Sequence, residues 1–540
     1  MYTCNNCGGS LRFDVVSQQL ICTKCSTLID PYAVEGEQTA EKELQYETME
    51  YTCPQCGARL LSEDTEAVAF CSYCGETSML AGKLTKAERP KYIIPFSKTK
   101  EECKKAYAKM MRGAVYTPKE LRNPEFIDGF RGIYIPYWYY GFEQKGRLHI
   151  SGYTTEYSGD YMYTHQYDLN ADIDADYDGL SYDASSAFLD NMSQQIAPYN
   201  LAGMKEFTPA YLSGFYADTA DVPAEVYRDE AKKIVVEDIS NRIKNEQTFE
   251  GFSKEGMEAV VEHNTVCSHS ERVMFPVWFL SYRNKGRVLY TAVNGQTGKM
   301  AADLPVDMKK YLLGTVILAV PLFFLLNMLP VVSPVYFLMI IIAIASVVVL
   351  LFYSELCKID VRDKNSDDLG LQNKQSPQRE GRRKRYYDPE YEYESQKKPT
   401  KKNSKMQLQS FFMVLGILVL IGIPIANEAG VLNGFATMLF SVLDVLMLFV
   451  SSMVSGVKTI KKQRGLSVVK GFGYITIWIA QMISLFVIWQ QPAYDVWYYG
   501  AAMITMAAIA TSLIDLIKAY NILASRKLPQ FNRVGGDDNA

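Results

Sequence analysis

Eight of the eleven cysteines in this 540-residue chain lie in four Cys-x-x-Cys pairs near the N-terminus. A tetrahedral zinc ion takes four soft ligands at about 2.3 Å, and two such pairs supply four sulfurs. Fourteen residues separate the two pairs in each copy, and the two copies have identical spacing. The spacing predicts two zinc ions per chain, one on each of these sets: Cys4, Cys7, Cys22, Cys25; and Cys53, Cys56, Cys71, Cys74.

Two other interpretations of these cysteines are redox-active pairs and ligand sets that interleave the two copies. Neither explains why each copy closes on itself at the same spacing. Gly8, Gly57 and Gly75 each follow a cysteine directly, where a tight turn favours positive φ, and Ser26 occupies the fourth such position. Cys-x-x-Cys pairs beside scattered free cysteines suit a reducing compartment, so we expect the module to be cytosolic.

Two small β-hairpins must position the cysteines. We expect zinc ribbons over 1–30 and 51–80, with an acidic linker over 31–50. Residues 1–88 contain six Lys and Arg against thirteen Asp and Glu, a net charge of −7. Because phosphate binding relies on Lys and Arg displacing counterions, this charge argues against nucleic acid as the partner and favours a docking module for protein.

A second repeat marks the region 90–305. PYWYYGFEQKGR at 136–147 aligns with PVWFLSYRNKGR at 276–287, and each run of aromatic residues ends in a Lys-Gly pair that predicts a hairpin turn. Helical patterns over about 99–112 and 223–246 precede the two copies. We therefore predict one α+β domain made of two related halves, with the repeated tryptophans as core anchors.

Two motifs in this domain resemble ligand sites. DADYDG at 174–179 begins like a calcium loop, but Ser185 stands where the bidentate Glu belongs, and the alternating pattern favours a half-buried strand. NGQTGK at 294–299 is too short for a phosphate loop and is better explained as a tight turn after a strand. No Ser/His/Asp or Cys/His arrangement is compelling, so we expect a protein that is not an enzyme.

Six apolar segments follow, most of them about 20 residues long and therefore long enough to cross a bilayer. They predict an α-helical membrane region of six transmembrane helices, divided into a hairpin over 311–353 and a four-helix domain over 410–517. The expected segments are 311–331, 334–353, 410–427, 433–454, 472–491 and 496–517.

The loops predict the orientation of these helices. Fourteen Lys and Arg lie in 354–409 and five in 458–471, whereas LPVVSP, NEAGVLNG and QQPAYD contain none. By the positive-inside rule, both termini and the tail 518–540 are cytosolic in a multi-pass protein of the cell membrane. The segment 354–409 is charged and poor in aliphatic residues, so we expect a disordered cytosolic linker.

Two polar residues lie at the middle of predicted spans, Asp444 in the fourth and Gln481 in the fifth. Intramembrane carboxylates are costly and often functional, which raises a transporter or pore role for Asp444. A hydrogen bond that joins neighbouring helices explains both residues equally well.

The ribbons, the YIPYW and FPVWF segments and the NGQTGK turn together resemble the bacterial membrane proteins with TFIIB-type zinc ribbons, over roughly residues 1–355. Some of those relatives are encoded beside flotillin-like (SPFH) proteins, which implies an envelope-associated assembly. The last four helices fall outside the resemblance and are interpreted as a fused membrane partner. The leading hypothesis is a non-enzymatic zinc-binding scaffold that recruits a cytosolic, flotillin-like protein to the bilayer. Transport through Asp444 and membrane tethering of nucleic acid are the alternatives.

Overall fold

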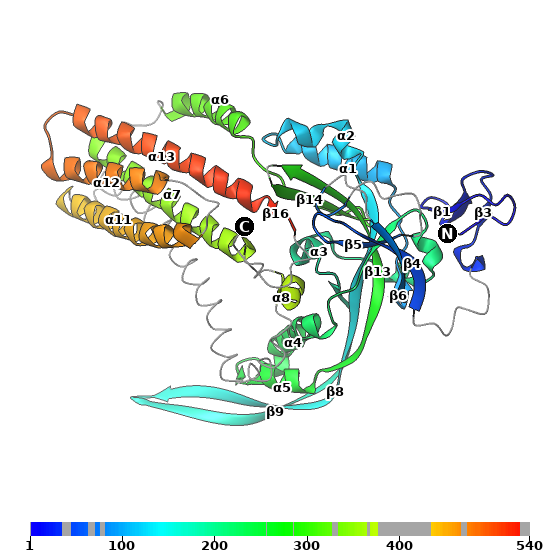
Figure 1. Cartoon of the computed structure of the whole chain (residues 1–540). Coiled ribbons are helices and arrows are strands. Elements are labelled where there is room, and N and C mark those ends of the chain that lie inside the picture. The colour runs from blue at the N-terminus through cyan, green and yellow to red at the C-terminus, as the bar shows by residue number, and fades with distance from the viewer. Residues whose placement is uncertain are drawn as a thin grey trace.

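The computed structural model describes residues 2–34, 45–62, 71–75, 81–254, 256–284, 286–326, 333–363, 368–375, 434–465 and 472–529. Figure 1 shows three parts: a bundle of long helices, a sheet-rich domain at one end of the bundle, and a small N-terminal module on the far side of that domain. The structure thus contains the three parts that the sequence predicts: clustered cysteines, a sheet-rich domain and membrane-type helices.

The N-terminal module is a three-stranded antiparallel sheet of β1 (Leu11–Asp14), β2 (Gln19–Cys22) and β3 (Leu28–Ile29). In β1, Leu11 and Phe13 are buried while Arg12 between them is exposed. This alternation is typical of a strand with one face on a core and the other in water.

The second cysteine copy does not form a separate ribbon. Its strands β4 (Gln45–Thr52), β5 (Arg59–Ser62) and β6 (Ala81–Glu88) pair antiparallel with one another. β5 also pairs with β11 (Tyr216–Asp218), which runs parallel to the long strand β8 (Arg131–Ser158). Residues 45–50, which the sequence assigned to a linker, thus belong to β4, and the second copy is the edge of a 13-stranded sheet.

The strands of this sheet are hydrogen-bonded in the order β10-β7-β13-β8-β11-β5-β4-β6. Outside this order, β9 and β12 pair with β8, β14 pairs with β13, and β15 and β16 pair with β14. Its remaining strands are β7 (Tyr92–Ile93), β9 (Tyr161–Asp183), β10 (Lys205–Glu206), β12 (Ser253–Lys254), β13 (Val266–Asn284), β14 (Arg287–Asn294), β15 (Met300–Ala302) and β16 (Arg526–Lys527).

The repeated segments lie side by side at the centre of the sheet. β8 and β13 are antiparallel, and their register sets Ile135 opposite Phe275, which are equivalent residues in the repeat. Pro136 then faces Met274, and Tyr134 faces Pro276. Each residue of one copy thus faces the residue on the opposite side of the equivalent position in the other copy. This pairing requires a local twofold axis between Ile135 and Phe275, and that axis relates the two halves of the domain.

The Lys-Gly pair makes a turn in only one of the two copies. At Gly286 the chain reverses from β13 into β14, as predicted. At Gly146 the prediction of a hairpin turn is wrong, because β8 continues to Ser158 and pairs with β9 along its length. Leu148 and Ile150 are buried beyond this point, so continued burial of alternate residues favours the extended strand.

Helices precede each copy of the repeat, as predicted: α1 (Lys100–Gly113) and α4 (Glu225–Asn245). The indole N–H of Trp278 donates to the carbonyl of Lys98 just before α1, and that of Trp138 donates to Val222 just before α4. Each tryptophan therefore fixes the helix of the other half, which joins the halves crosswise.

Shorter helices are α2 (Pro124–Ile127), α3 (Asp190–Ile196) and α5 (Met257–Asn264).

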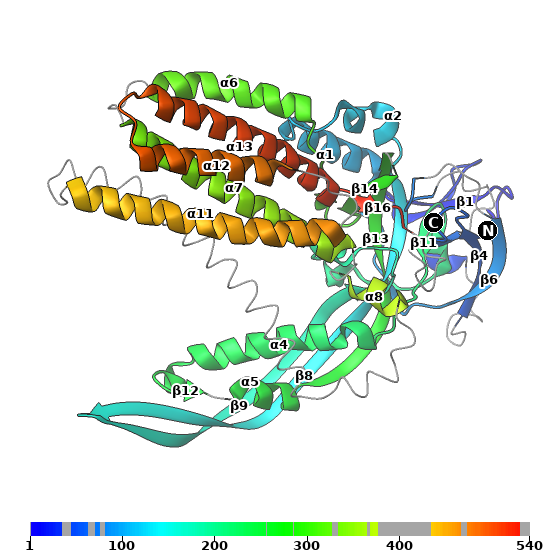
Figure 2. The same ribbon diagram turned by 60° about the vertical axis from the view of Figure 1, so that its left-hand side comes forward.

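β8 and β9 form a long hairpin that extends from the sheet domain in both views (Figures 1 and 2). α4 and α5 pack on one face of it, over Leu148, Ile150 and Ala171. The DADYDG motif is part of β9, so the strand prediction is confirmed and Asp174, Asp176 and Asp178 do not form a loop around a cation.

Among the residues that the structure describes, three helices are long and apolar enough to cross a bilayer, with candidate spans Pro334–Arg362, Gly473–Gln490 and Val496–Leu523. These helices support a membrane region, but the predicted number of six transmembrane helices is not supported. Segment 410–427 lies outside the described residues, and the apolar stretch described in the fourth segment, Val445–Ile460, is shorter than a span. The helices here are α6 (Met308–Leu326), α7 (Pro334–Asp363), α8 (Leu369–Gln375), α11 (Gly434–Gly465), α12 (Gly473–Gln490) and α13 (Val496–Leu523).

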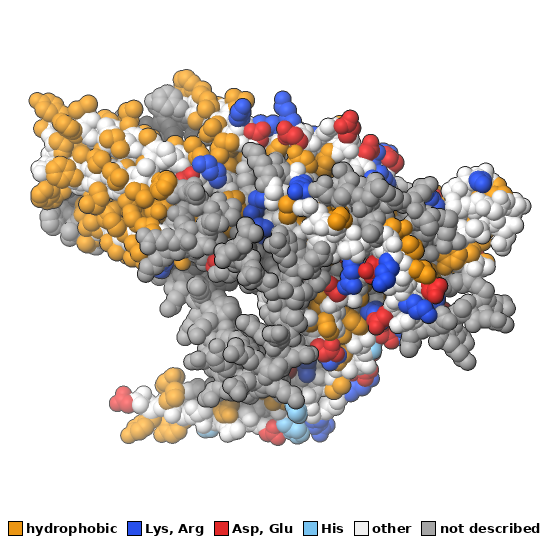
Figure 3. Space-filling view, viewed as in Figure 1, with side chains coloured by type: hydrophobic (Ala, Val, Ile, Leu, Met, Phe, Trp, Pro, Cys, Tyr) orange, Lys and Arg blue, Asp and Glu red, His pale blue; other side chains and the backbone are white. Residues whose placement is uncertain are grey.

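α7 belongs to the first predicted pair, yet it packs against α11, α12 and α13. Figure 3 shows hydrophobic side chains over this bundle and charged side chains over the sheet domain. After α13, β16 adds to β14, and the Arg287 guanidinium donates to the carbonyls of Ile522 and Ser525. The last helices are therefore bound into the rest of the chain by packing and by sheet pairing.

Candidate metal centres

The first cysteine cluster has the geometry of a tetrahedral site. Four sulfurs at 2.3 Å from one zinc ion lie about 3.8 Å apart. The Sγ–Sγ distances are 3.7 Å for Cys4–Cys25, 3.4 Å for Cys7–Cys22 and 3.3 Å for Cys7–Cys25. All four sulfurs lie within 4.8 Å of one another, so this donor set fits a metal ion and is of the type that zinc ribbons use.

The second cluster repeats this geometry. Cys53 and Cys74 sulfurs are 3.7 Å apart, as are those of Cys56 and Cys71. This cluster also has all four sulfurs within 4.8 Å of one another. Each copy therefore brings together its own four predicted ligands, and the interleaved pairing is wrong. Zinc bound at either site would act structurally, because cysteine sulfurs fill all four tetrahedral positions.

Tight turns aim the sulfurs at a common point. The amides of Gly8, Gly57 and Gly75 each donate to the carbonyl of the first cysteine of their pair, at 2.8 to 3.0 Å. Ser26 makes the same bond to Cys22, and its φ of 56° lies close to the 66 to 76° of the three glycines. The fourth turn is thus the same as the others, although an L side chain in this region costs about 1–2 kcal/mol.

The two centres differ in the solvent exposure of their cysteines. Cys53, Cys56, Cys71 and Cys74 are at most 1% exposed and belong to the main core, with Phe188, Phe279 and Tyr290. In the first centre, Cys7 and Cys25 are exposed. The hydroxyl and amide of Thr27 lower the pKa of the Cys25 thiol to about 6, which favours the thiolate that a metal needs.

Tyr73, between the last two ligands of the second centre, connects it to a buried polar group. Its hydroxyl donates to the Asp218 carboxylate, which also accepts from the Ser185 hydroxyl. Burial raises the pKa of Asp218 to about 6, and the two donated hydrogen bonds oppose that rise. Burial raises the pKa of Tyr73 well above its usual range, so Tyr73 remains a hydrogen-bond donor. Sequence reasoning missed this link between the second copy and β11.

The first centre is docked on the sheet domain. The amide of Phe13 donates to the carbonyl of Ser213, and the Phe13 ring packs edge-on against Tyr211 at a centroid distance of 5.1 Å. The Gln18 amide donates to the carbonyl of Phe96 at 2.7 Å. The Tyr32 hydroxyl also donates to the carbonyl of Glu206, so the module has a fixed position, while Val16 and Leu28 are exposed.

Of the two predicted intramembrane residues, the side chain of Asp444 lies outside the part that the structure describes. Gln481 is fully buried, and its amide donates to Ser346 Oγ at 2.9 Å and to the carbonyl of Ile342. Its Oε1 accepts from Ser452 Oγ at 3.2 Å. Gln481 of α12 thus joins α7 and α11, as the helix-joining interpretation expects.

A buried carboxylate in the last turns of α13 was missed because it lies near the end of its predicted segment. Asp515 of α13 is 9% exposed, and its Oδ2 accepts from the amide of Gly473 at 3.0 Å. It caps the N-terminus of α12 from a neighbouring helix, which satisfies a free helix N–H.

The NGQTGK motif is also structural: Asn294 Oδ1 accepts from the amides of Gln296 and Thr297, which confirms the predicted turn.

The uncharacterized protein YdjG of Bacillus subtilis strain 168 is 30% identical to this chain over 313 residues. The similarity covers 57% of this chain and 91% of YdjG. No family model matches the chain, and no solved structure matches it.

Proposed function

This chain belongs to the family of the Bacillus subtilis protein YdjG, and we propose that it is a non-enzymatic, zinc-binding membrane scaffold that recruits a cytosolic protein to the bilayer. One observation carries the proposal: the first Cys4 module is held on the outside of a domain that is itself fixed to the membrane-type helices. The module docks through Phe13 and Gln18, and the helices are fixed through Arg287.

The exposed side of the first module is the recruiting surface. It contains the apolar residues Val16 and Leu28, which are 79% and 49% exposed, and the exposed cysteines Cys7 and Cys25. Large apolar side chains grouped on a small rigid module are typical of a protein-binding patch. The second centre is buried, so the first is the one available to a partner.

The finer features of the proposal come from the sequence. Both centres hold zinc in TFIIB-type Cys4 sites, the second of them built into the main sheet. The chain crosses the cell membrane six times, and both termini face the cytosol. The resemblance to proteins encoded beside flotillin-like (SPFH) proteins makes an SPFH-type oligomer the proposed partner. The acidic N-terminal region disfavours nucleic acid, and the satisfied hydrogen bonds of Gln481 favour helix joining over transport.

A matched pair of substitutions tests recruitment. Leu28→Glu changes the proposed surface, and Leu84→Glu changes an exposed leucine on the edge strand β6 of the main sheet. A photo-crosslinking residue at position 16 and a co-expressed flotillin-like protein from the same genome give the readout in intact membranes. We expect Leu28→Glu to abolish the crosslink and to release the partner into the cytosol, and Leu84→Glu to change neither.

Unchanged partner localisation in the Leu28→Glu variant would contradict the recruiting surface. Zinc content measured on the same samples controls for loss of the module.

Labelling of single cysteines introduced at 332, 390 and 429 tests the orientation: the proposal expects external access at 332 and 429 only.

A further inference from the structure

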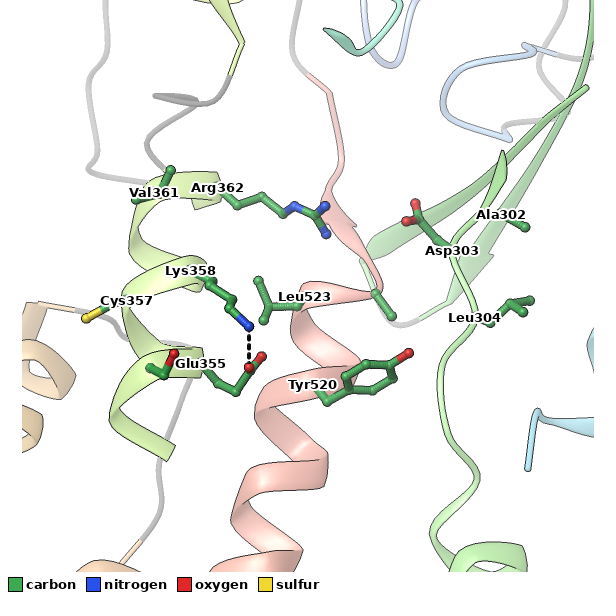
Figure 4. Close-up of a pocket in the computed structure, with 12 residues that line it drawn as sticks. Ala302, Asp303, Leu304, Glu355, Cys357, Lys358, Val361, Arg362, Tyr520 and Leu523 are labelled. Atoms are coloured by element: carbon green, nitrogen blue, oxygen red, sulfur yellow. Dashed lines mark hydrogen bonds and ion pairs between the residues drawn. The ribbon is translucent and has the colours of Figure 1, made fainter. Parts of the chain in front are cut away.

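A cavity of about 540 Å³ lies where the membrane-type helices meet the sheet domain. Its walls come from three places in the chain: the last turns of α7, the last turns of α13, and the segment that follows β15 (Figure 4). A volume in this range is typical of sites for small ligands. Its lining includes Asp303, Glu355, Lys358, Arg362, Tyr520 and Leu523.

The lengths of the helices set the depth of this cavity relative to a bilayer. α7 has 30 residues and α13 has 28, so at 1.5 Å per residue they are about 45 and 42 Å long. The hydrocarbon layer is about 30 Å thick, and some ten residues of each helix extend beyond it. Both helices end at the cavity, which therefore lies at the level of the lipid headgroups on the side of the sheet domain.

The lining combines two cations and two carboxylates with apolar side chains. Lys358 and Arg362 project from α7 into the space between α7, α13 and the segment after β15 (Figure 4). Leu304, Val361 and Leu523 also line the cavity. Figure 4 shows Leu523 and the ring of Tyr520 on the α13 side, and Val361 on the face of α7 that points away from α13. Lysine, arginine and tyrosine at the end of a span are the side chains that contact lipid headgroups.

Acidic groups in the wall are already engaged. Glu355 pairs with Lys358 at 2.7 Å, which uses one of the three N–H donors of that ammonium group. Asp303 is buried and accepts from the amide of Tyr290 at 3.3 Å. Burial raises the pKa of Asp303, and the positive charges of Arg362 and Arg526 oppose that rise, so Asp303 is shared between two guanidinium groups. The C-terminal carbonyls of α13 are bound by Arg287, so their negative end is partly neutralised.

We propose that this cavity binds the phosphate of an anionic membrane lipid, with Lys358 and Arg362 as its cationic ligands and with the glycerol and upper acyl chains along Leu523 and Tyr520 of α13. A guanidinium and an ammonium group provide the donors that recognise phosphate, and basic pockets between transmembrane helices bind anionic headgroups in the same way. The lipid fills the joint between the membrane helices and the sheet domain. This site is independent of the recruiting surface.

The test uses the full-length protein in nanodiscs that contain phosphatidylglycerol and phosphatidylcholine, with bound lipid measured by native mass spectrometry. The variant Lys358→Ala/Arg362→Ala removes both cations. The control Lys518→Ala removes a lysine of α13 that is outside the cavity and pairs with Asp515. A cation near anionic lipid contributes about 1 kcal/mol, so we expect about a fivefold loss of retained phosphatidylglycerol per residue removed, and no loss in the control.

A second variant changes the shape of the site and leaves its charge intact. Ala524→Phe fills the cavity from α13 and is expected to displace the lipid, even if the double variant does not fold. Equal retention by the wild type, the Ala524→Phe variant and the double variant would overturn the proposal. Binding of soluble glycerol phosphate in detergent, with the same dependence on Lys358 and Arg362 but without lipid retention, would also overturn the assignment to a lipid.

Discussion

The two Cys4 modules share one spacing and one ligand geometry, yet they differ in depth. The sulfurs of the second module lie in the main core, and all four of its cysteines are at most 1% exposed. The first module lies on the outside of the same domain, with Cys7 and Cys25 exposed. A metal motif therefore determines the local turn and the ligand set, while the residues around it determine whether the site is a surface or part of a core.

The strands that follow the cysteines carry this difference. β1 reads Leu11-Arg12-Phe13, with only the two apolar residues buried. β5 reads Leu60-Leu61 at the corresponding place, and both leucines are buried. A strand that is apolar on both faces is covered on both faces, so β5 lies inside the large sheet and β1 on a small one.

Loss of a metal ligand gives the largest expected contrast. Structural zinc contributes about 10–16 kcal/mol in small zinc domains, as much as the whole stability of a typical domain. We expect Cys56→Ser to unfold the sheet domain, because its zinc would stabilise the core. Cys7→Ser should lose one zinc and leave β8 and β13 folded. Zinc per chain and hydrogen exchange of these strands measure both effects, and equal loss of protection in the two variants would refute the difference in depth.

Metal removal by a chelator should separate the two centres in time. A chelator reaches the exposed Cys7 and Cys25 sulfurs directly, whereas the second centre must first open. An opening cost of about 3 kcal/mol slows release about a hundredfold. We expect two kinetic phases of equal amplitude with a colorimetric zinc chelator. The Cys7→Ser variant should show only the slow phase, and a single fast phase there would show that the second centre is accessible.

Residues at equivalent positions between the last two ligands give a smaller contrast. Tyr73 in the second copy is fully buried and donates to Asp218, whereas Lys24 in the first copy is exposed. Tyr73→Phe leaves the carboxylate without one donor, and we expect a loss of about 2 kcal/mol in the free energy of unfolding of the sheet domain. Lys24→Ala should change it by less than about 0.5 kcal/mol. Denaturant-dependent hydrogen exchange in β5 and β11 measures both.

The smallest expected effect concerns the turn at Ser26. Ser26→Gly removes the cost of a left-handed conformation and should stabilise the first module by about 1 kcal/mol. The reciprocal change, Gly75→Ser, introduces that cost in the second copy, where a Cβ atom meets nothing closer than 3.5 Å. Zinc competition should therefore show about a fivefold tighter first site in one variant and a weaker second site in the other. Effects of the same sign would exclude backbone strain as the cause.

Local patterns predicted the parts of the fold that depend on neighbouring residues. The Cys-x-x-Cys spacing identified both ligand sets, and the apolar periodicity found α1 and α4. The repeat at 136–147 and 276–287 located the central strands β8 and β13. Its Lys-Gly turn failed at Gly146, because the choice between a turn and a longer strand depends on whether a partner such as β9 lies alongside.

The sequence by itself determined the metal ligands, the sheet-rich domain and the apolar helices, because sulfur donors, turns and hydrophobic periodicity are set within a few residues. Only the tertiary structure decided that the second centre is core, that Gln481 joins α7 and α11, and that Arg287 fixes the end of α13. Those outcomes arise from contacts between residues up to 238 positions apart. Their free energy depends on burial in the assembled chain, which a local pattern does not contain.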